Sequence, residues 1–261
     1  MLKTLGYTII ALAFAGICAA GLLYMHFMNW SDAPMAAESQ EKIFTVAPGQ
    51  GLKQTAAALK QEQLVSDALR FTLLARIEKK DTLIQAGEYF LSAAMTPRQI
   101  LNQLVAGRVH LYRVTIPEGY TLVQIAAAVA KAGLASETEF LETARDPDMA
   151  ARLGIDAATL EGYLFPDPYY FPRGLDSATI AAAMVKQFRA AFTPQWEARA
   201  AELGMSVHEV VTLASIIEKE TGAPQERPLI SSVFHNRLAK GMRLETDPTV
   251  IYGIADFDGN I

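Results

Sequence analysis

Cysteine is nearly absent from this sequence, which has one, Cys18, among 261 residues. A single cysteine cannot form an intrachain disulfide, and it cannot supply the thiolates of a cysteine-rich zinc site. Histidine is also scarce, with four residues, and there is no Gly-x-Ser-x-Gly elbow or glycine-rich phosphate loop. These absences exclude a disulfide scaffold. They also argue against a serine hydrolase of the elbow type and a P-loop nucleotide-binding enzyme.

Positive charge is not in excess either. Lys and Arg number 23 against 28 Asp and Glu, giving a formal net charge of −5 and a pI near 5.5. Proteins that bind nucleic acids neutralise phosphates with basic side chains, so we expect no nucleic-acid partner. The apolar fraction of 51% and the mean hydropathy of +0.16 exclude a disordered chain. The length suits one large domain or two small ones.

The amino terminus carries a long run without charged residues, from Thr4 to Ser31. Its apolar part, Leu5–Met28, is long enough to cross a hydrocarbon core of about 30 Å as a helix, whereas the apolar region of a signal peptide is shorter. Lys3 precedes the run and Asp32 follows it, so the positive flank should stay in the cytoplasm. We therefore predict a single transmembrane helix within residues 1–31, with the rest of the chain outside. A cleaved signal is the alternative.

An internal repeat follows a polar linker, residues 32–43. Shifting the sequence by 70 positions aligns Phe44–Ser66 with Val114–Ser136, and nine of the 23 pairs are identical. Each copy has a β-rich run, a turn with proline and glycine, and then apolar residues at helical spacing. The class predicted is α+β. We expect a small lobe at 44–108 and a mixed α/β domain rich in helices at 109–261.

The second domain is predicted to be mostly helical, with helices at Met205–Thr221 and Pro228–Lys240. Leu160–Gly174 has five aromatic residues and three prolines, which predicts a rigid irregular loop or one wall of a sugar-binding cleft. Thr249–Tyr252 reads as a short strand. Asp258-Gly259-Asn260 is a hairpin-turn signal with no return strand after it, so we expect this domain to be truncated at its C-terminus.

Glu218 has an unusual place on its helix. Successive residues turn by about 100°, which puts Val207, Val211 and Ile217 on one arc. Glu218 falls inside that arc, whereas Glu209 falls on the far side. Burial raises the pKa of a carboxyl group, and such a group can deliver a proton near neutral pH. Glu218 is therefore a candidate general acid, and a structural ion pair is the alternative.

Three further residues near the end of the chain bear on that choice. Arg237 projects into the apolar arc of its own helix, where it would pair with Glu218 or bind a substrate carboxylate. Glu245 and Asp247 add two carboxylates, either of which could complete the acid pair of a hydrolytic glycosidase. Glu245-x-Asp247 lacks the spacing of a calcium loop, so we expect no metal and no cofactor.

Four segments of the chain form an ordered set of motifs: Leu160–Asp167 (LEGYLFPD), Ala214–Thr221 (ASIIEKET), Ser232–Leu238 (SVFHNRL) and Met242–Gly253 (MRLETDPTVIYG). Together they resemble the endolytic murein transglycosylase family, also called YceG-like. The membrane helix and the Ile116–Gly119 (IPEG) turn agree with this resemblance.

The resemblance implies an enzyme of the bacterial inner membrane with a periplasmic body and a LysM-like lobe. Such an enzyme cuts peptidoglycan glycan strands internally between N-acetylmuramic acid and N-acetylglucosamine, ends strand growth, and works beside the synthases, the penicillin-binding proteins. The catalytic residue implied is Glu218. Substrate contacts are expected from five neighbours in the motifs and from one residue of the aromatic segment: Asn236, Arg237, Glu245, Thr246, Asp247 and Tyr163.

This sequence departs from the family at two of its motif positions. Glu245 stands where the family usually has Gln, and Pro168 where it usually has Thr. The family also continues beyond the point at which this sequence ends. Two other functions therefore stay open, a muramidase that hydrolyses the same bond and a membrane scaffold that binds glycan without catalysis.

Overall fold

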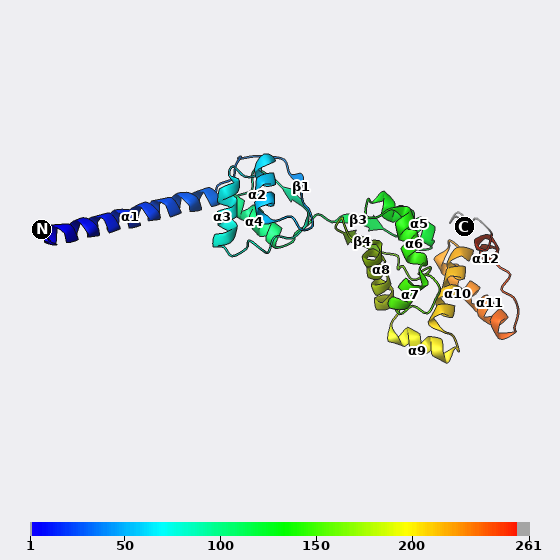
Figure 1. Cartoon of the computed structure of the whole chain (residues 1–261). Coiled ribbons are helices and arrows are strands. Elements are labelled where there is room, and N and C mark those ends of the chain that lie inside the picture. Colours follow the sequence, from blue (N-terminus) through cyan, green and yellow to red (C-terminus); the bar gives the residue numbers. More distant parts are fainter. Residues whose placement is uncertain (1, 255–261) are drawn as a thin grey trace. The chain divides into compact units, whose positions relative to one another are not determined.

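The computed structural model describes residues 2–254, and the chain divides into two compact units, Met1–His110 and Leu111–Ile261. Each unit combines helices with a two-stranded antiparallel sheet (Figure 1). This is the α+β class that the sequence predicts. The hairpin-turn signal Asp258-Gly259-Asn260 lies outside the described residues.

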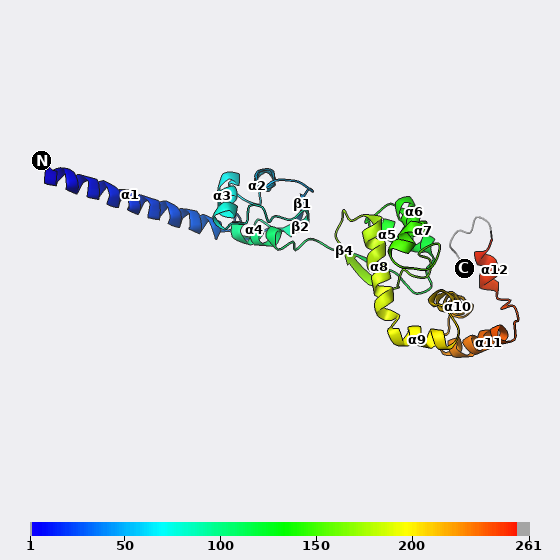
Figure 2. The ribbon, with the colours of Figure 1, turned by 60° about the horizontal axis from the view of Figure 1, so that its bottom comes forward.

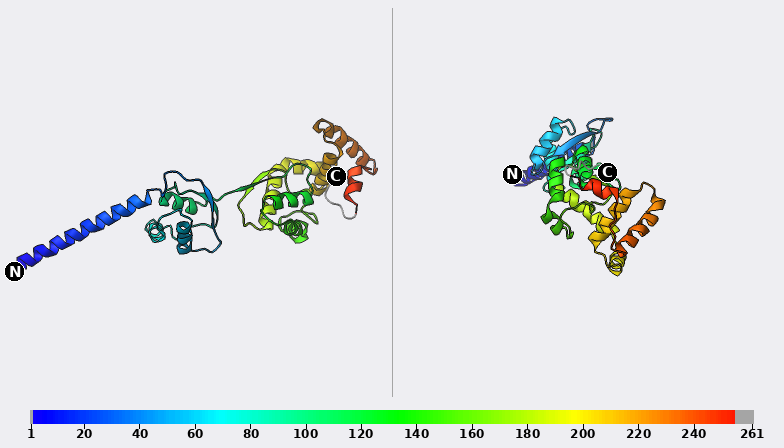
Figure 3. Two further views of the ribbon diagram at one scale, coloured as in Figure 1. Left: turned by 90° about the horizontal axis from the view of Figure 1, so that it is seen from above. Right: turned by 90° about the vertical axis from the view of Figure 1, so that its right-hand side faces the viewer.

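The first element, α1 (Leu2–Ser31), is a helix of 30 residues that projects from the first unit (Figures 1 and 3). An 18-residue window within Leu12–Ser31 has a mean hydropathy of 1.5 and is not buried in the protein, whereas Ser31 itself is buried. A helix of this length and composition can cross a membrane, and a signal sequence would have the same properties.

The first unit closes around a sheet of β1 and β2. Its elements are β1 (Lys42–Val46), α2 (Leu52–Gln61), α3 (Ala68–Ile77), β2 (Gly87–Leu91) and α4 (Pro97–Val105). Phe44 is opposite Tyr89 in the antiparallel register, and both side chains are buried, whereas Ile43 faces solvent. Alternation of this kind places one face of the sheet on a core that the helices cover.

The polar segment after α1 is attached to the first unit at several points. The indole Nε1 of Trp30 donates a hydrogen bond to Ser66 Oγ at 2.8 Å. Farther along, the Ala36 amide donates to the Ala93 carbonyl at 2.9 Å, and Ser92 Oγ donates to the Ser39 carbonyl at 3.0 Å. The segment has no helix or strand of its own over 34–41, yet it lies against the lobe.

In the second unit, the sheet and most of the helices precede the predicted catalytic helix along the chain (Figure 2). β3 pairs with β4, with Tyr112 opposite Phe171 and Thr115 opposite Pro168. The core lies under α5, α6 and α8 and includes Phe140 and Met184, which are fully buried. The elements are β3 (Tyr112–Thr115), α5 (Leu122–Lys131), α6 (Glu137–Arg145), α7 (Pro147–Arg152), β4 (Pro168–Phe171), α8 (Ser177–Ala191), α9 (Pro194–Glu202), α10 (Val207–Glu220), α11 (Arg227–Ala239) and α12 (Asp247–Tyr252).

One local prediction is wrong and another is correct in part. Most of the segment Leu160–Gly174 is irregular, as predicted, but it contains the strand β4, which Pro168 begins at a position where its missing N–H is tolerated. Thr249–Tyr252, predicted to be a strand, lies in α12. That helix has Thr246 at its N-cap and proline in its first turn. These start signals outweigh the β-branched residues that follow.

Candidate active site

The helix that carries Glu218 begins with a strong cap. Ser206 Oγ accepts from the Glu209 amide at 3.2 Å, while the Glu209 carboxylate accepts from the Ser206 amide at 2.7 Å. This capping box fixes the start of α10 and therefore the direction in which each later side chain points. Glu218 projects from the last turn of the helix, which ends at Glu220.

An arginine from the next helix holds the Glu218 carboxylate. Arg227 Nη2 lies 2.9 Å from Oε1 and 2.7 Å from Oε2, and the Glu218 side chain keeps 28% of its surface exposed. The same Nη2 lies 3.8 Å from Glu118. Glu218 is therefore an accessible, ion-paired carboxylate. The expectation that apolar neighbours enclose it is wrong.

The turn before α5 borders Glu218 on another side. Gly119 has a backbone φ of +72°, which favours glycine. A Cβ built on Gly119 would lie 3.5 Å from Glu218 Cγ and 3.7 Å from Lys219 Cε. The IPEG turn therefore lies beside the end of α10, and any side chain at position 119 would contact Glu218. Together with Arg227, this turn and the end of α10 form a small charged site, which we call the Glu218 site.

A second carboxylate, that of Glu161, contacts the backbone where the same turn meets α5. Both of its oxygens are 3.1 Å from the Leu122 amide at the start of α5, and its side chain also hydrogen-bonds Tyr252 of α12. Burial raises the pKa of Glu161 above its usual range, although these hydrogen bonds act in the opposite direction. A cavity of about 310 Å³ opens here, and its lining includes Arg145, Glu161 and Tyr252.

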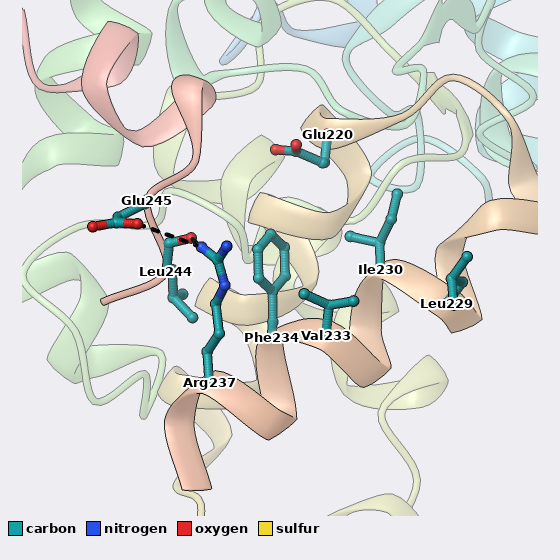
Figure 4. A pocket seen from close by; sticks show the side chains of 8 residues that line it. All are labelled: Glu220, Leu229, Ile230, Val233, Phe234, Arg237, Leu244 and Glu245. Atoms are coloured by element: carbon teal, nitrogen blue, oxygen red, sulfur yellow. Dashed lines mark hydrogen bonds and ion pairs between the residues drawn. The ribbon is translucent and has the colours of Figure 1, made fainter. Parts of the chain in front are cut away.

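The other predicted site residues lie around a different cavity. It measures about 250 Å³ and is drawn in Figure 4. Arg237 donates to the Leu244 carbonyl and lies 4.0 Å from Glu245, so it is Arg227, and not Arg237, that pairs with Glu218. The lining residues are Glu220, Leu229, Ile230, Val233, Phe234, Arg237, Leu244 and Glu245.

The helix geometry separates this cavity from the Glu218 site. Residues two apart on a helix point about 160° away from each other, so Glu218 and Glu220 face opposite sides of α10. Glu220 accepts a hydrogen bond from the buried Thr246 hydroxyl at 2.5 Å, which fixes the loop before α12. Asn236 and Asp247 are exposed.

Tyr163 is part of the core. Its side chain is 2% exposed, its ring packs edge-on against Phe188, and its hydroxyl lies 2.9 Å from His208 Nδ1. His208 is an exposed residue of α10. The Tyr163 side chain is thus engaged in the core, and its contact with substrate stays a prediction.

Sequence reasoning missed Arg227 and Glu118 at the Glu218 site, and Glu161 at the start of α5. Arg227 had a weak signal, an arginine at the start of a helix nine residues after an unexplained acid. Glu161 lies in the motif LEGYLFPD, and no feature of the sequence around it indicates a buried acid. Within residues 2–254 no three His, Cys, Asp or Glu side chains come together as a metal ion would require.

Comparison with known proteins places this geometry in context. The model of the YceG-like family matches residues 44–261. An endolytic murein transglycosylase of Bacillus subtilis is 31% identical over 84% of this chain and 65% of its own length. One from Streptococcus pneumoniae is 28% identical over 98% of this chain and 51% of its own length. The chain thus spans about half to two thirds of these relatives. A crystal structure of a Listeria monocytogenes protein described as YceG-like matches 85% of this chain and 78% of its own, at 32% identity and a TM-score of 0.51.

Proposed function

This chain belongs to the YceG-like family, and we propose that it is a membrane-anchored lytic transglycosylase. It would cut peptidoglycan strands internally between N-acetylmuramic acid and N-acetylglucosamine and so end their elongation. The observation that carries the proposal is the placement of Glu218, an accessible carboxylate that Arg227 orients beside the IPEG turn. The names of the relatives support the reaction class.

In the proposed mechanism Glu218 acts first as an acid and then as a base. Protonated Glu218 gives its proton to the glycosidic oxygen while the bond from that oxygen to C1 of the muramic acid breaks. The oxygen of the substrate's own N-acetyl group shelters the positive charge at C1. The Glu218 carboxylate then takes the proton of the 6-hydroxyl, whose oxygen closes on C1. The product is a 1,6-anhydro end, and no water is consumed.

Arg227 Nη2 contacts both oxygens of the Glu218 carboxylate. A protonated carboxyl group uses one oxygen as an O–H donor, so the acid half of the cycle requires this contact to loosen. Glu118, 3.8 Å from the same nitrogen, is an alternative partner for the guanidinium. We infer that Arg227 moves toward Glu118 when substrate arrives and returns after bond cleavage.

The rest of the chain would place this chemistry at the membrane. In the proposal α1 spans the bacterial inner membrane with its N-terminus in the cytoplasm, because Lys3 precedes the apolar run and acidic residues follow it. The first unit would be the LysM-like lobe that holds glycan outside the cytoplasm. Partners would be glycan strands and the peptidoglycan synthases.

The test is Glu218→Gln in the full chain, incubated with purified sacculi and followed by mass spectrometry of the released ends. The amide keeps the shape of the side chain but cannot transfer a proton, so turnover should fall by about 10²–10⁴-fold. The matched control is Glu245→Gln, which changes an exposed acid in the same way and should cost far less. Circular dichroism verifies folding of both variants.

Two results would contradict the proposal. One is a Glu218→Gln protein that folds and retains its activity. The other is wild-type product that carries a water molecule at its new end instead of the anhydro ring, which would establish a muramidase.

A further inference from the structure

The outer face of α3 in the first unit carries a stripe of exposed apolar side chains. Leu69 is 79% exposed, Leu73 47% and Ile77 49%. They are four residues apart, so they form one continuous line along the helix. The opposite face, with Phe71 and Leu74, is fully buried in the core. A soluble helix would normally expose polar side chains here, and the stripe therefore indicates a contact surface.

This stripe borders the end of α1. α3 and α1 are in contact, and Figures 1 and 2 show α3 beside the place where α1 joins the unit. The Arg70 guanidinium lies over the Trp30 ring, 5.9 Å from its centroid. On α3, Arg70 is only about 20° around the helix axis from Ile77. The apolar stripe and the end of α1 are therefore neighbours on the surface.

Arg98 of α4 locks this junction. Its Nε donates to Asp32 at 2.7 Å and its Nη2 to Ser31 Oγ at 2.8 Å. Its Nη1 contacts Glu78, the C-cap residue that follows α3. One guanidinium thus joins the end of α1 to the end of α3. With Trp30 on the other side, the angle between the two helices is held by at least two independent contacts.

The end of the apolar run in α1 would determine the level at which α3 lies relative to the bilayer. The apolar window ends at Ser31, so a hydrocarbon core of about 30 Å would end close to that residue, and the headgroup layer would extend about 5–8 Å farther. Residues that touch Trp30 and Ser31 then lie at the headgroup level. Arg70 and Arg76 flank the stripe, and arginines in this position bind lipid phosphates while apolar neighbours enter the acyl boundary.

We propose that the Leu69–Leu73–Ile77 stripe of α3 is a membrane-contact surface that inserts into the phospholipid leaflet around α1. Arg70 and Arg76 would pair with lipid phosphates. The occupant is lipid because α3 borders the end of the apolar helix α1 and the stripe has cations at its edges. This inference rests on α1 being a membrane span, which is part of the proposed function.

The test uses the full chain in vesicles of phosphatidylethanolamine and phosphatidylglycerol that contain a nitroxide lipid, shallow or deep. Three proteins each carry one fluorophore on one cysteine. The first uses the exposed native Cys18. The others are Cys18→Ser with Leu73→Cys, and Cys18→Ser with Arg108→Cys. Position 108 is exposed and close to the end of the first unit.

We expect the label at position 73 to be quenched severalfold more than the label at 108, and more by the shallow nitroxide than by the deep one. Adding Leu69→Asp and Ile77→Asp to the Leu73→Cys protein should reduce that quenching severalfold. Quenching at position 73 no greater than at 108, with Cys18 quenched, would overturn the stripe proposal and leave the anchor intact. Because lipid is the only possible occupant in this assay, that outcome would mean that the stripe binds a protein instead of lipid. An unquenched Cys18 would instead refute the membrane span, and with it this inference.

Discussion

Replacing Tyr163 with phenylalanine removes one hydroxyl group from the core of the second unit. The ring remains, so the edge-on contact with Phe188 at a centroid distance of 5.1 Å is retained. The loss is the 2.9 Å hydrogen bond to His208 Nδ1. His208 is an exposed residue, so water can replace the lost partner. The cost should therefore be near the net value of one hydrogen bond, about 1 kcal/mol, and below the penalty for stranding a buried group.

Urea unfolding followed by tryptophan fluorescence measures this change. The chain has two tryptophans, Trp30 in the first unit and Trp196 in the second. A Trp30→Phe background leaves Trp196, on α9, as the reporter for the unit that contains Tyr163. The free energy of unfolding should fall by about 1 kcal/mol and the melting temperature by about 2–4 °C. The control Tyr170→Phe, at a 56% exposed residue, should change stability by less than about 0.5 kcal/mol.

Activity toward sacculi separates the structural role from the sequence-based prediction that Tyr163 binds substrate. A structural tyrosine loses stability and keeps most of its activity below the unfolding transition. If Tyr163→Phe unfolds like the parent protein but loses activity, the hydroxyl touches the glycan and our interpretation of its burial is wrong.

Two other substitutions test charges around the proposed active site. Arg227→Gln removes the side chain that orients Glu218. Stability should change by about 1 kcal/mol or less, since both groups are about one-third exposed, while turnover should fall by about 10–10²-fold because the carboxylate loses the contact that positions it. Activity equal to that of the surface control Arg199→Gln would show that Arg227 does not position Glu218. Glu161→Gln tests the raised pKa of Glu161: the folded state binds more protons than the unfolded state between the two pKa values, so stability falls as pH rises through that window. The Gln amide carries no charge and so avoids this penalty, and its oxygen can still accept from the Leu122 amide. The melting temperature of Glu161→Gln relative to wild type should therefore be higher at pH 7 than at pH 4. An equal difference at both pH values would contradict the raised pKa of Glu161.

Local signals predicted the helices well, because a cap or a turn residue acts on its own neighbours. The Ser206–Glu209 pair forms the capping box expected from its spacing. Gly49 and Gly119, the matching glycines of the internal repeat, both have a positive φ, +78° and +72°. In both copies the helix after the turn begins three residues beyond the glycine, at Leu52 and Leu122.

Contacts between distant residues were the part that the sequence could not predict. The wheel of α10 identified Glu218 as unusual, but its partner Arg227 comes from beyond the next turn, and no periodicity reports such a contact. The same limit applies to burial. Tyr163 lies in a segment rich in aromatic residues, and only the packing of α8 and α10 around it decides that this tyrosine faces inward.

The contacts at the end of α1 couple the movement of this helix to that of the lobe in the first unit. Trp30, Ser31 and Asp32 are bonded to Ser66 and Arg98, so a turn of α1 about its own axis turns the lobe with it. Lengthening the segment 34–41 would not move the lobe relative to α1, since that segment follows these contacts. Adding one residue to α1 before Trp30, in contrast, would move the lobe by about 1.5 Å along the helix axis and rotate it by about 100° about that axis. The length of α1 would therefore determine both the position of the first unit along the helix axis and its orientation about that axis.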